Sequence, residues 1–381
     1  MLTALSFSAI VTNGKMQGGG PYFMISRSIG PAFGGATGLM FWMCYVFNAT
    51  FNATAFVEDI QHTVVSHAGD AAWPPWAFPV LYHGVLCLLF GIAWIGAGCF
   101  SKVNTMLFLT LVTAILVSFF SLFFASAHGG GGGGGGGGGR VVSPQPINCS
   151  SDPDSIMDTS DPWYASHLVN ATYYGPSMAR FRENLWPHRD ATLGPGGARR
   201  QVSGQWDLAN NLQVVVALIF TSTCGVLEGA NLSGDLKDPA RALPKGTLFA
   251  QLTAFTVYIV FASLMAASFD RDSLRCDYYL LQEVAASEYF VVVGMAMATL
   301  STSLGALFGG SRVLQAIARD DLFPYLGYFA KGTKKGDEPR RAVVLTWLLA
   351  NVFGYIGGSA VNGIAAILTD FFLTAYLFVN I

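Results

Sequence analysis

One stretch of the sequence combines an apolar run with residue types that are suited to binding an ion. Residues 214–246 read VVVALIFTSTCGVLEGANLSGDLKDPARALPKG, and they begin as a membrane helix would. Small hydroxyl residues and glycines then interrupt the run, and Gly225 and Gly229 are poor helix formers. Hydrocarbon tolerates open backbone N–H and C=O groups only where they line a cavity or a polar site, so a break here would present half-helix ends to an ion. The alternative is an unbroken helix whose small residues allow close packing.

Two carboxylates lie within apolar runs. Glu228 comes three residues after Gly225, and Asp370 lies in the last apolar run. An ionisable group at membrane depth is costly and is by default a functional candidate. We therefore predict that one or both bind a proton or a cationic solute; the alternative is that Glu228 faces a cytoplasmic vestibule and is hydrated. Glu58 and Asp59 close another apolar run, and we expect both to be solvated.

The composition requires a membrane environment for the elements that carry these residues. Of the 381 residues, 52% are hydrophobic and only 12% are charged, whereas typical soluble domains carry roughly 25% charged residues. Repeated apolar runs with so little charge predict an all-α, multi-pass protein in a lipid bilayer. A span needs about 20 residues, so Met1 to Val11 reads as the last half of a helix. Full spans are predicted at 36–60, 79–98, 103–126, 209–232, 247–267, 289–311, 342–358 and 361–381.

The basic residues between these spans indicate the topology. Lysines and arginines gather in alternate loops, around Lys15 and Arg27, at Lys102, from Lys237 to Lys245, and from Arg319 to Arg341. Basic loops face the cytoplasm. Membrane helices at 1–126 and 209–381 then flank one long loop, 127–208, on the extracellular or lumenal side of the plasma membrane or an endomembrane.

The long loop contains eleven consecutive glycines, Gly129 to Gly139, which we interpret as a flexible spacer. Beyond the spacer, Asn148 and Asn170 each begin an N-glycosylation sequon. The same pattern also occurs at Asn48, Asn52 and Asn231, but these three lie in predicted spans, so we interpret their match as chance.

Several classes of function are excluded by what the sequence lacks. No nucleophile–base pairing, zinc-ligand spacing or nucleotide-binding loop is present, so we expect no enzyme, no metal and no cofactor. Gly18 to Gly20 do not follow a strand and precede no Lys-Ser/Thr pair, so they read as a tight turn. A net charge of −2 without a basic patch argues against a nucleic-acid partner.

Four separate motifs in one order carry a resemblance to a known family. TNGKMQGGGPYFMISRSIGPAFGGATGLMF, GANLSGDLKDPARALPKGT, GGSRVLQAIARDDLFPYL and DFFLTAYLFVN together resemble the cation–chloride cotransporters (solute carrier family 12) of the amino acid–polyamine–organocation superfamily. The resemblance implies an inverted-repeat (5+5) transporter fold with broken helices. The partial helix would be the family's second, the 214–246 stretch its sixth, and Ile381 would lie in its tenth. The first helix and the C-terminal region would be absent.

Two further segments bear on the branch of this family. The sequence Arg182-Glu-Asn-Leu-Trp186 near the end of the long loop is similar to the potassium–chloride branch. ARDDLF at 318–323 and the segment 269–283 look closer to the cotransporter-interacting-protein branch. The family resemblance also implies a homodimer for the full-length protein.

The resemblance assigns an anion site to the break. In the family, backbone N–H groups at the sixth-helix break and a tenth-helix tyrosine hold chloride, and the matching positions are Gly225, Val226, Leu227 and Tyr376. Open amides at a half-helix end favour negative charge, and a phenol can donate one more hydrogen bond. Read alone, Tyr376 would be an interfacial aromatic.

The family's potassium-site positions are altered here. They correspond to Asn52, Thr221 and Cys224; the first two can still offer oxygen to a hard cation, but a cysteine is a poor ligand for one.

The segment from Ala298 to Thr302 resembles sodium-dependent members, which predicts a sodium site at Ala298, Ser301 and Thr302. The alternative is that these hydroxyls bond carbonyls of their own helix.

Three functions are compatible with these observations. The first is symport of chloride with a monovalent cation, potassium and/or sodium, by alternating access. The second is an amino-acid or polyamine permease of the same superfamily, which the carboxylates Glu228 and Asp370 would suit. The third is a non-transporting regulatory partner of other cotransporters, which the altered potassium site suggests. Ion dependence of the flux separates the three.

Overall fold

The computed structural model describes residues 2–13, 19–68, 73–124, 140–141, 147–148, 168–169, 172–185, 219–220, 225–276, 279–285, 287–334, 336–357 and 361–380. The chain divides into two compact units. Unit 1 comprises Met1–Leu111, Ala217–Ala254 and Met295–Ile381, and unit 2 comprises Val112–Val216 and Phe255–Gly294. Each unit is described by itself.

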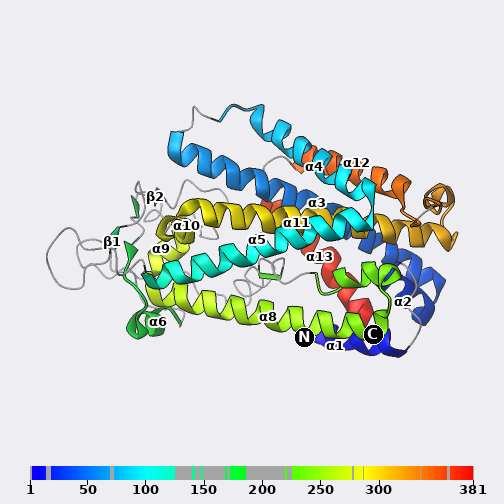
Figure 1. The fold of residues 1–381 in the computed structure, drawn as a ribbon, viewed down its shortest axis with the longest axis horizontal. Coiled ribbons are helices and arrows are strands. Elements are labelled where there is room, and N and C mark those ends of the chain that lie inside the picture. Colours follow the sequence, from blue (N-terminus) through cyan, green and yellow to red (C-terminus); the bar gives the residue numbers. More distant parts are fainter. Residues whose placement is uncertain are drawn as a thin grey trace, which may run out of the picture. The chain divides into compact units, whose positions relative to one another are not determined.

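Unit 1 is built from helices arranged around α3 (Figure 1). Its elements are α1 (Leu2–Asn13), α2 (Gly20–Ile29), α3 (Pro31–Ala68), α4 (Ala77–Ile95), the first part of α5 (Ala97–Phe124), the 3-10 helix η3 (Glu228–Asp235), the first part of α8 (Pro239–Ser268), most of α11 (Glu288–Arg319), the 3-10 helix η4 (Leu326–Phe329), α12 (Arg340–Gly357) and α13 (Val361–Asn380).

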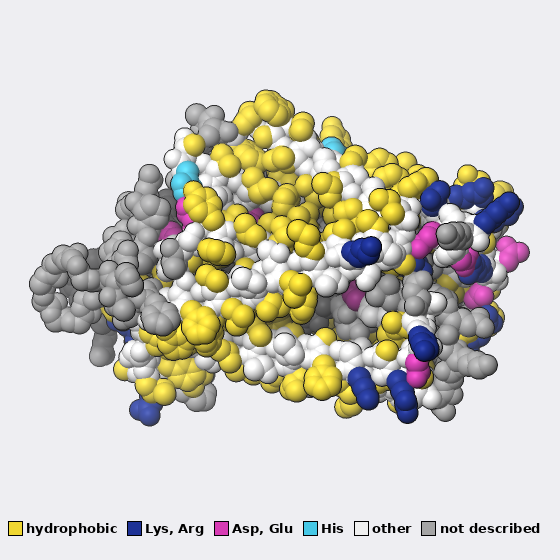
Figure 2. All heavy atoms as spheres, in the orientation of Figure 1, with side chains coloured by type: hydrophobic (Ala, Val, Ile, Leu, Met, Phe, Trp, Pro, Cys, Tyr) yellow, Lys and Arg dark blue, Asp and Glu magenta, His cyan; other side chains and the backbone are white. Residues whose placement is uncertain are grey.

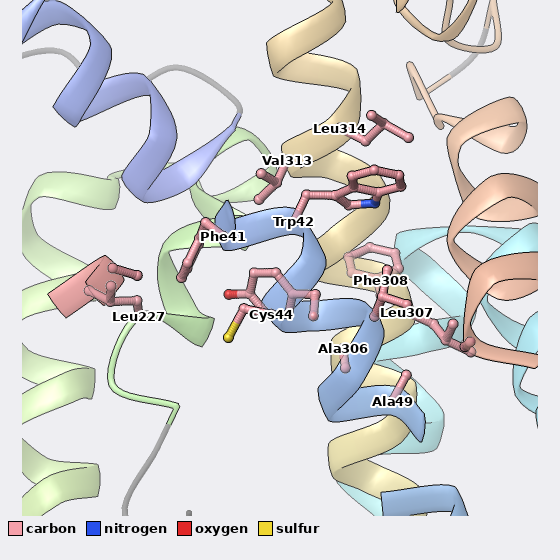
Figure 3. Packing of buried hydrophobic residues seen from close by; sticks show 14 of the residues in the cluster. Phe41, Trp42, Cys44, Ala49, Leu227, Ala306, Leu307, Phe308, Val313 and Leu314 are labelled. Carbon is pink, nitrogen blue, oxygen red and sulfur yellow. The ribbon is translucent and has the colours of Figure 1, made fainter. Parts of the chain in front are cut away.

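The central helix of unit 1 is α3, which packs against α2, α4, α12 and α13. Aromatic and aliphatic side chains of α3, such as Phe41 and Trp42, share one buried cluster with Phe308 and Leu314 of α11 (Figure 3). Some of the polar groups in this core are paired; the Trp42 Nε1–H, for example, donates a hydrogen bond of 3.0 Å to the Thr346 hydroxyl of α12. Satisfied polar groups make burial of such a core favourable.

Most of the predicted spans are confirmed as helices. The runs at 36–60, 79–98, 103–126, 247–267, 289–311, 342–358 and 361–381 correspond to α3, α4, α5, α8, α11, α12 and α13, and the partial first helix corresponds to α1. Within the described residues, α4, α5, α8 and α11 are each long and apolar enough to cross a membrane. The chain is therefore a helical integral membrane protein.

One expectation at the end of α3 is wrong. Asp59 was predicted to be solvated where an apolar run ends, but α3 continues to Ala68 and the Asp59 side chain is only 6% exposed. The helix continues because the polar segment that follows, QHTVVSHA, contains no glycine or proline to end it.

Basic side chains mark one end of unit 1. Lys and Arg side chains gather in Figure 2 at the end that holds α2, η4 and the first turns of α8 and α12. The loops that the charge pattern predicts to be cytoplasmic contribute to this end, whereas hydrophobic side chains cover much of the rest of the visible face.

Unit 2 holds the described parts of the long loop together with the remaining turns of α5, α8 and α11. In the long loop, strand β1 (Arg140–Val141) pairs antiparallel with β4 (Thr172–Tyr173), strand β2 (Ile147–Asn148) pairs antiparallel with β3 (Leu168–Val169), and helix α6 (Met178–Leu185) follows. Two short helices, α9 (Arg271–Cys276) and α10 (Leu280–Val284), lie between α8 and α11. The Asn184 side chain donates hydrogen bonds of 2.8 and 2.9 Å to the carbonyls of Ala266 and Phe269. Gly129 to Gly139 and Asn170 lie outside the described residues.

Candidate functional site

The predicted break in the 214–246 stretch is present. Gly225 has a φ of 105°, in the left-handed region that favours glycine. The Glu228 N–H then donates to the Gly225 carbonyl at 3.0 Å, and the chain continues as the 3-10 helix η3 rather than as an α-helix. Thr221 and Cys224, two of the predicted potassium-site positions, lie outside the described residues.

The break brings Gly225 next to Tyr376 of α13. The Gly225 N–H donates a hydrogen bond of 2.9 Å to the Tyr376 hydroxyl oxygen. Tyr376 is 7% exposed and packs against Phe220 and Phe372, with ring centroids 5.9 and 5.7 Å away. Val226 and Leu227, the other predicted chloride positions, are buried beside them. An amide donor and a phenol from distant parts of the sequence therefore meet in a buried setting.

A second buried polar contact lies on the other side of the break, and sequence reasoning missed it. Asn231 of η3 is 2% exposed, and its side-chain amide donates a hydrogen bond of 2.5 Å to the Tyr45 hydroxyl of α3. Two glycines leave space for the Asn231 side chain. A Cβ at Gly20 would lie 2.7 Å from its Oδ1 atom, and a Cβ at Gly309 would lie 2.6 Å from its Nδ2 atom. The signal was an amide inside an apolar run, which was interpreted only as a chance sequon.

Glu228 lies in the same group of residues. Its Oε1 atom is buried and has no hydrogen-bond partner in the described part of the chain. Tyr45 lies close enough to Glu228, Cys44 and Tyr376 to interact with each of them electrostatically, and the Asn231 side chain interacts with the Glu228 carboxylate. Asp370, the second predicted carboxylate, is instead exposed on α13, and its backbone carbonyl accepts the Thr374 hydroxyl at 2.8 Å.

The predicted cation positions make local contacts. The Asn52 side-chain amide donates to the Asn48 carbonyl at 2.9 Å and to the Asn48 side-chain oxygen at 2.8 Å.

At the predicted sodium site, the Thr302 hydroxyl donates to the Ala298 carbonyl at 2.8 Å, which is the within-helix bond considered as the alternative. The Ser301 hydroxyl donates to the side-chain oxygen of Asn104 on α5. Two of the three predicted sodium ligands are thus bonded to each other, and the third is bonded to a neighbouring helix.

No group of three or more His, Cys, Asp or Glu side chains that could hold a metal ion occurs among the described residues.

Long apolar helices, together with a helix break that holds buried polar groups, place the chain in the class of helical integral membrane proteins. The amino acid permease family model matches residues 1–152 and 165–381, so the chain belongs to the amino acid permease family.

The chain is also similar to individual curated proteins. The chain is 32% identical to solute carrier family 12 member 9 from Homo sapiens and from Xenopus laevis, over 100% of this chain and 38% of each relative. It is 31% identical to vacuolar cation–chloride cotransporter 1 from Saccharomyces cerevisiae, over 100% of this chain and 30% of the relative. These similarities support the cation–chloride cotransporter family. The chain spans less than two fifths of the length of these relatives.

Proposed function

We propose that the protein is a secondary active symporter that moves chloride together with a monovalent cation, potassium and/or sodium, by alternating access. The observation that carries this proposal is the meeting of the Gly225 N–H and the Tyr376 hydroxyl at the break, 2.9 Å apart. The similarity to a relative named as a cation–chloride cotransporter supports the choice of ions.

The chemistry of this pair suits an anion. The Gly225 N–H and the Tyr376 O–H are both hydrogen-bond donors, and a backbone amide at a helix break favours negative charge. In the structure, the Tyr376 oxygen accepts the hydrogen bond of the Gly225 N–H. Chloride would therefore replace this oxygen as the acceptor, and it would accept one hydrogen bond from the Gly225 N–H and one from the Tyr376 O–H. Val226 and Leu227 would complete the site with their backbone N–H groups.

The test is chloride-dependent uptake of rubidium or sodium by the full-length protein in liposomes. Tyr376→Phe is expected to raise the chloride KM roughly tenfold or more, because a hydrogen bond to a charged group contributes about 1.5–3 kcal/mol. Tyr355→Phe is the matched control, since Tyr355 is 79% exposed on α12. An unchanged chloride KM in Tyr376→Phe would reject the site.

A second candidate, transport of an amino acid or polyamine, is favoured by Glu228, whose buried Oε1 atom could pair with an amino group. Solute-driven currents in the absence of chloride would support it over the first. A protein without flux of its own that alters the flux of a co-expressed cotransporter would instead be a regulatory partner.

The same proposal includes the topology. The basic end of unit 1 faces the cytoplasm, the 127–208 loop faces the outside or the lumen, and Asn148 and Asn170 carry glycans. Asn148→Gln and Asn170→Gln should each remove one glycosidase-sensitive mobility shift, and chemical cross-linking of the full-length protein should reveal a homodimer.

A further inference from the structure

Asp59 is a buried carboxylate that the proposed chloride site does not use. Its side chain is 6% exposed, and neither carboxylate oxygen has a hydrogen-bond partner in the described part of the chain. Burying an ionised carboxylate without a partner is far more costly than any single packing contact can offset. An occupant that supplies positive charge would remove this cost.

The helices around α3 do not supply that charge within the described residues. The helices packed on α3 are α2, α4, α11, α12 and α13. Their arginines are Arg27, Arg312, Arg319, Arg340 and Arg341, and α4 also carries His83. Helix α11 runs antiparallel to α3, because Ser303 bonds Ala49 and Gly310 lies against Tyr45, so Arg312 and Arg319 are toward the start of α3. Arg27 is near the start of α3, and Arg340 and Arg341 begin α12. Helices α3 and α12 run in the same direction, because Trp42 of α3 bonds Thr346 of α12 and, further along both helices, Thr50 bonds Ala350. These arginines therefore lie at the opposite end of α3 from Asp59.

On α3 itself, the neighbouring titratable groups are Glu58 and His62. Glu58 adds a second negative charge beside Asp59. The imidazole of His62 follows one turn later, and its side chain is half-buried.

The position of Asp59 relates it to the candidate site. Tyr45, Asn52 and Asp59 are spaced by seven residues, so they lie along one face of α3. At about 1.5 Å per residue, Asp59 lies roughly 10 Å beyond Asn52 and roughly 21 Å beyond Tyr45 along the helix axis. Tyr45 bonds Asn231 beside the break, and Asn52 bonds Asn48. One face of α3 thus carries oxygen-bearing side chains from the candidate site to Asp59.

We propose that Asp59 is a binding site for a monovalent cation on the route between the outer end of α3 and the central site. The role of Asp59 on a transport route rests on the proposed function, whereas cation binding by Asp59 does not. A carboxylate is the kind of oxygen ligand that a hard cation prefers, and the side-chain oxygens of Asn52 and Tyr45 would receive the ion further along the same face of α3.

Binding can be measured without transport. The full chain, purified in detergent, is heated in rubidium or sodium gluconate and, at equal ionic strength, in N-methylglucamine gluconate. A ligand that binds the folded state raises Tm. The wild type is expected to show a higher Tm in rubidium or sodium, and Asp59→Asn is expected to lose this rise. In N-methylglucamine, Asp59→Asn should be at least as stable as the wild type, because the uncompensated charge is gone.

Glu58→Gln is the matched control, since it removes the adjacent carboxylate from a different face of α3; it should retain the cation-dependent rise in Tm. The proposal is overturned if Asp59→Asn keeps the full rise, if Glu58→Gln loses it equally, or if only a lower pH stabilises the wild type, which would identify a proton as the occupant. An Asp59-dependent rise together with absent chloride-dependent uptake would reject the proposed symport and leave the cation site. Normal symport without the rise would reject the cation site alone.

Discussion

Arg312 of α11 and Glu338, in the segment before α12, form an ion pair of 3.2 Å in which the two side chains are 11% and 14% exposed. Glu338 also accepts the Ala97 N–H at the start of α5, at 2.8 Å. The Arg312 guanidinium lies over the Phe308 ring, 4.2 Å from its centroid. One carboxylate thus joins α11 and the first turn of α5 to the segment that leads into α12.

Because this pair is largely buried, removing one partner should be strongly destabilising. Glu338→Gln leaves the Arg312 charge without its partner, and we expect a loss of about 3–5 kcal/mol in stability, seen as a lower Tm in detergent. Arg27→Gln is the comparison, since its pair with Asp320 at 3.3 Å has an arginine side chain that is 62% exposed; such exposed pairs contribute about 0–1 kcal/mol. Equal losses in the two variants would contradict the structural role of Glu338.

Packing around Gly354 gives a second prediction. A Cβ at this position of α12 would overlap the hydroxyl and ring of Tyr82, which is 1% exposed and donates to the Ala350 carbonyl at 2.8 Å. Gly354→Ala should therefore lower stability by about 1–3 kcal/mol through overpacking. Gly84→Ala in α4 meets nothing within 4 Å and should raise stability by roughly 0.5–1 kcal/mol, because alanine is the better helix former. Thermal unfolding of both variants checks the pair, and a stabilised Gly354→Ala would show that α12 packs differently.

The third prediction concerns Glu228. Its buried Oε1 lacks a hydrogen-bond partner among the described residues, and Tyr45 and Asn231, whose side chains interact with this carboxylate, carry no positive charge. If this carboxylate binds a proton during transport, Glu228→Gln should abolish most of the pH dependence of chloride-dependent uptake. The pH dependence of uptake by Asp370→Asn, which removes the exposed carboxylate of α13, shows whether this second carboxylate contributes to that pH dependence. An unchanged pH profile in Glu228→Gln would reject the proton hypothesis.

The sequence predicted where the helices are better than where they end. Hydropathy reports the part of a helix that lipid contacts, and polar turns can continue beyond it. The span expected at 247–267 accordingly begins at Pro239, because proline is favoured in the first turn of a helix. The continuation of α3 to Ala68 has the same origin, and it converts Asp59 from an expected surface residue into a buried one.

The candidate site divides in a similar way. The break at Gly225 could be predicted because a glycine between apolar residues is a local signal. The contact between Asn231 and Tyr45 could not, since these residues are 186 positions apart and each alone resembles an ordinary polar residue in a helix. The within-helix bond of Thr302 was considered from sequence because it depends only on residues four positions apart.

The last prediction separates a sodium site from ordinary helix bonding. The Thr302 hydroxyl donates to the Ala298 carbonyl, and three residues earlier the Thr299 hydroxyl donates to the Met295 carbonyl at 3.0 Å. If Ala298, Ser301 and Thr302 bind sodium, the ion must replace the first of these bonds, so Thr302→Val and Ser301→Ala should each raise the sodium KM of uptake. Thr299→Val removes an equivalent within-helix bond outside the predicted site and should leave the sodium KM unchanged. Similar sodium KM values for Thr302→Val and Thr299→Val would show that the hydroxyls of α11 only bond their own helix.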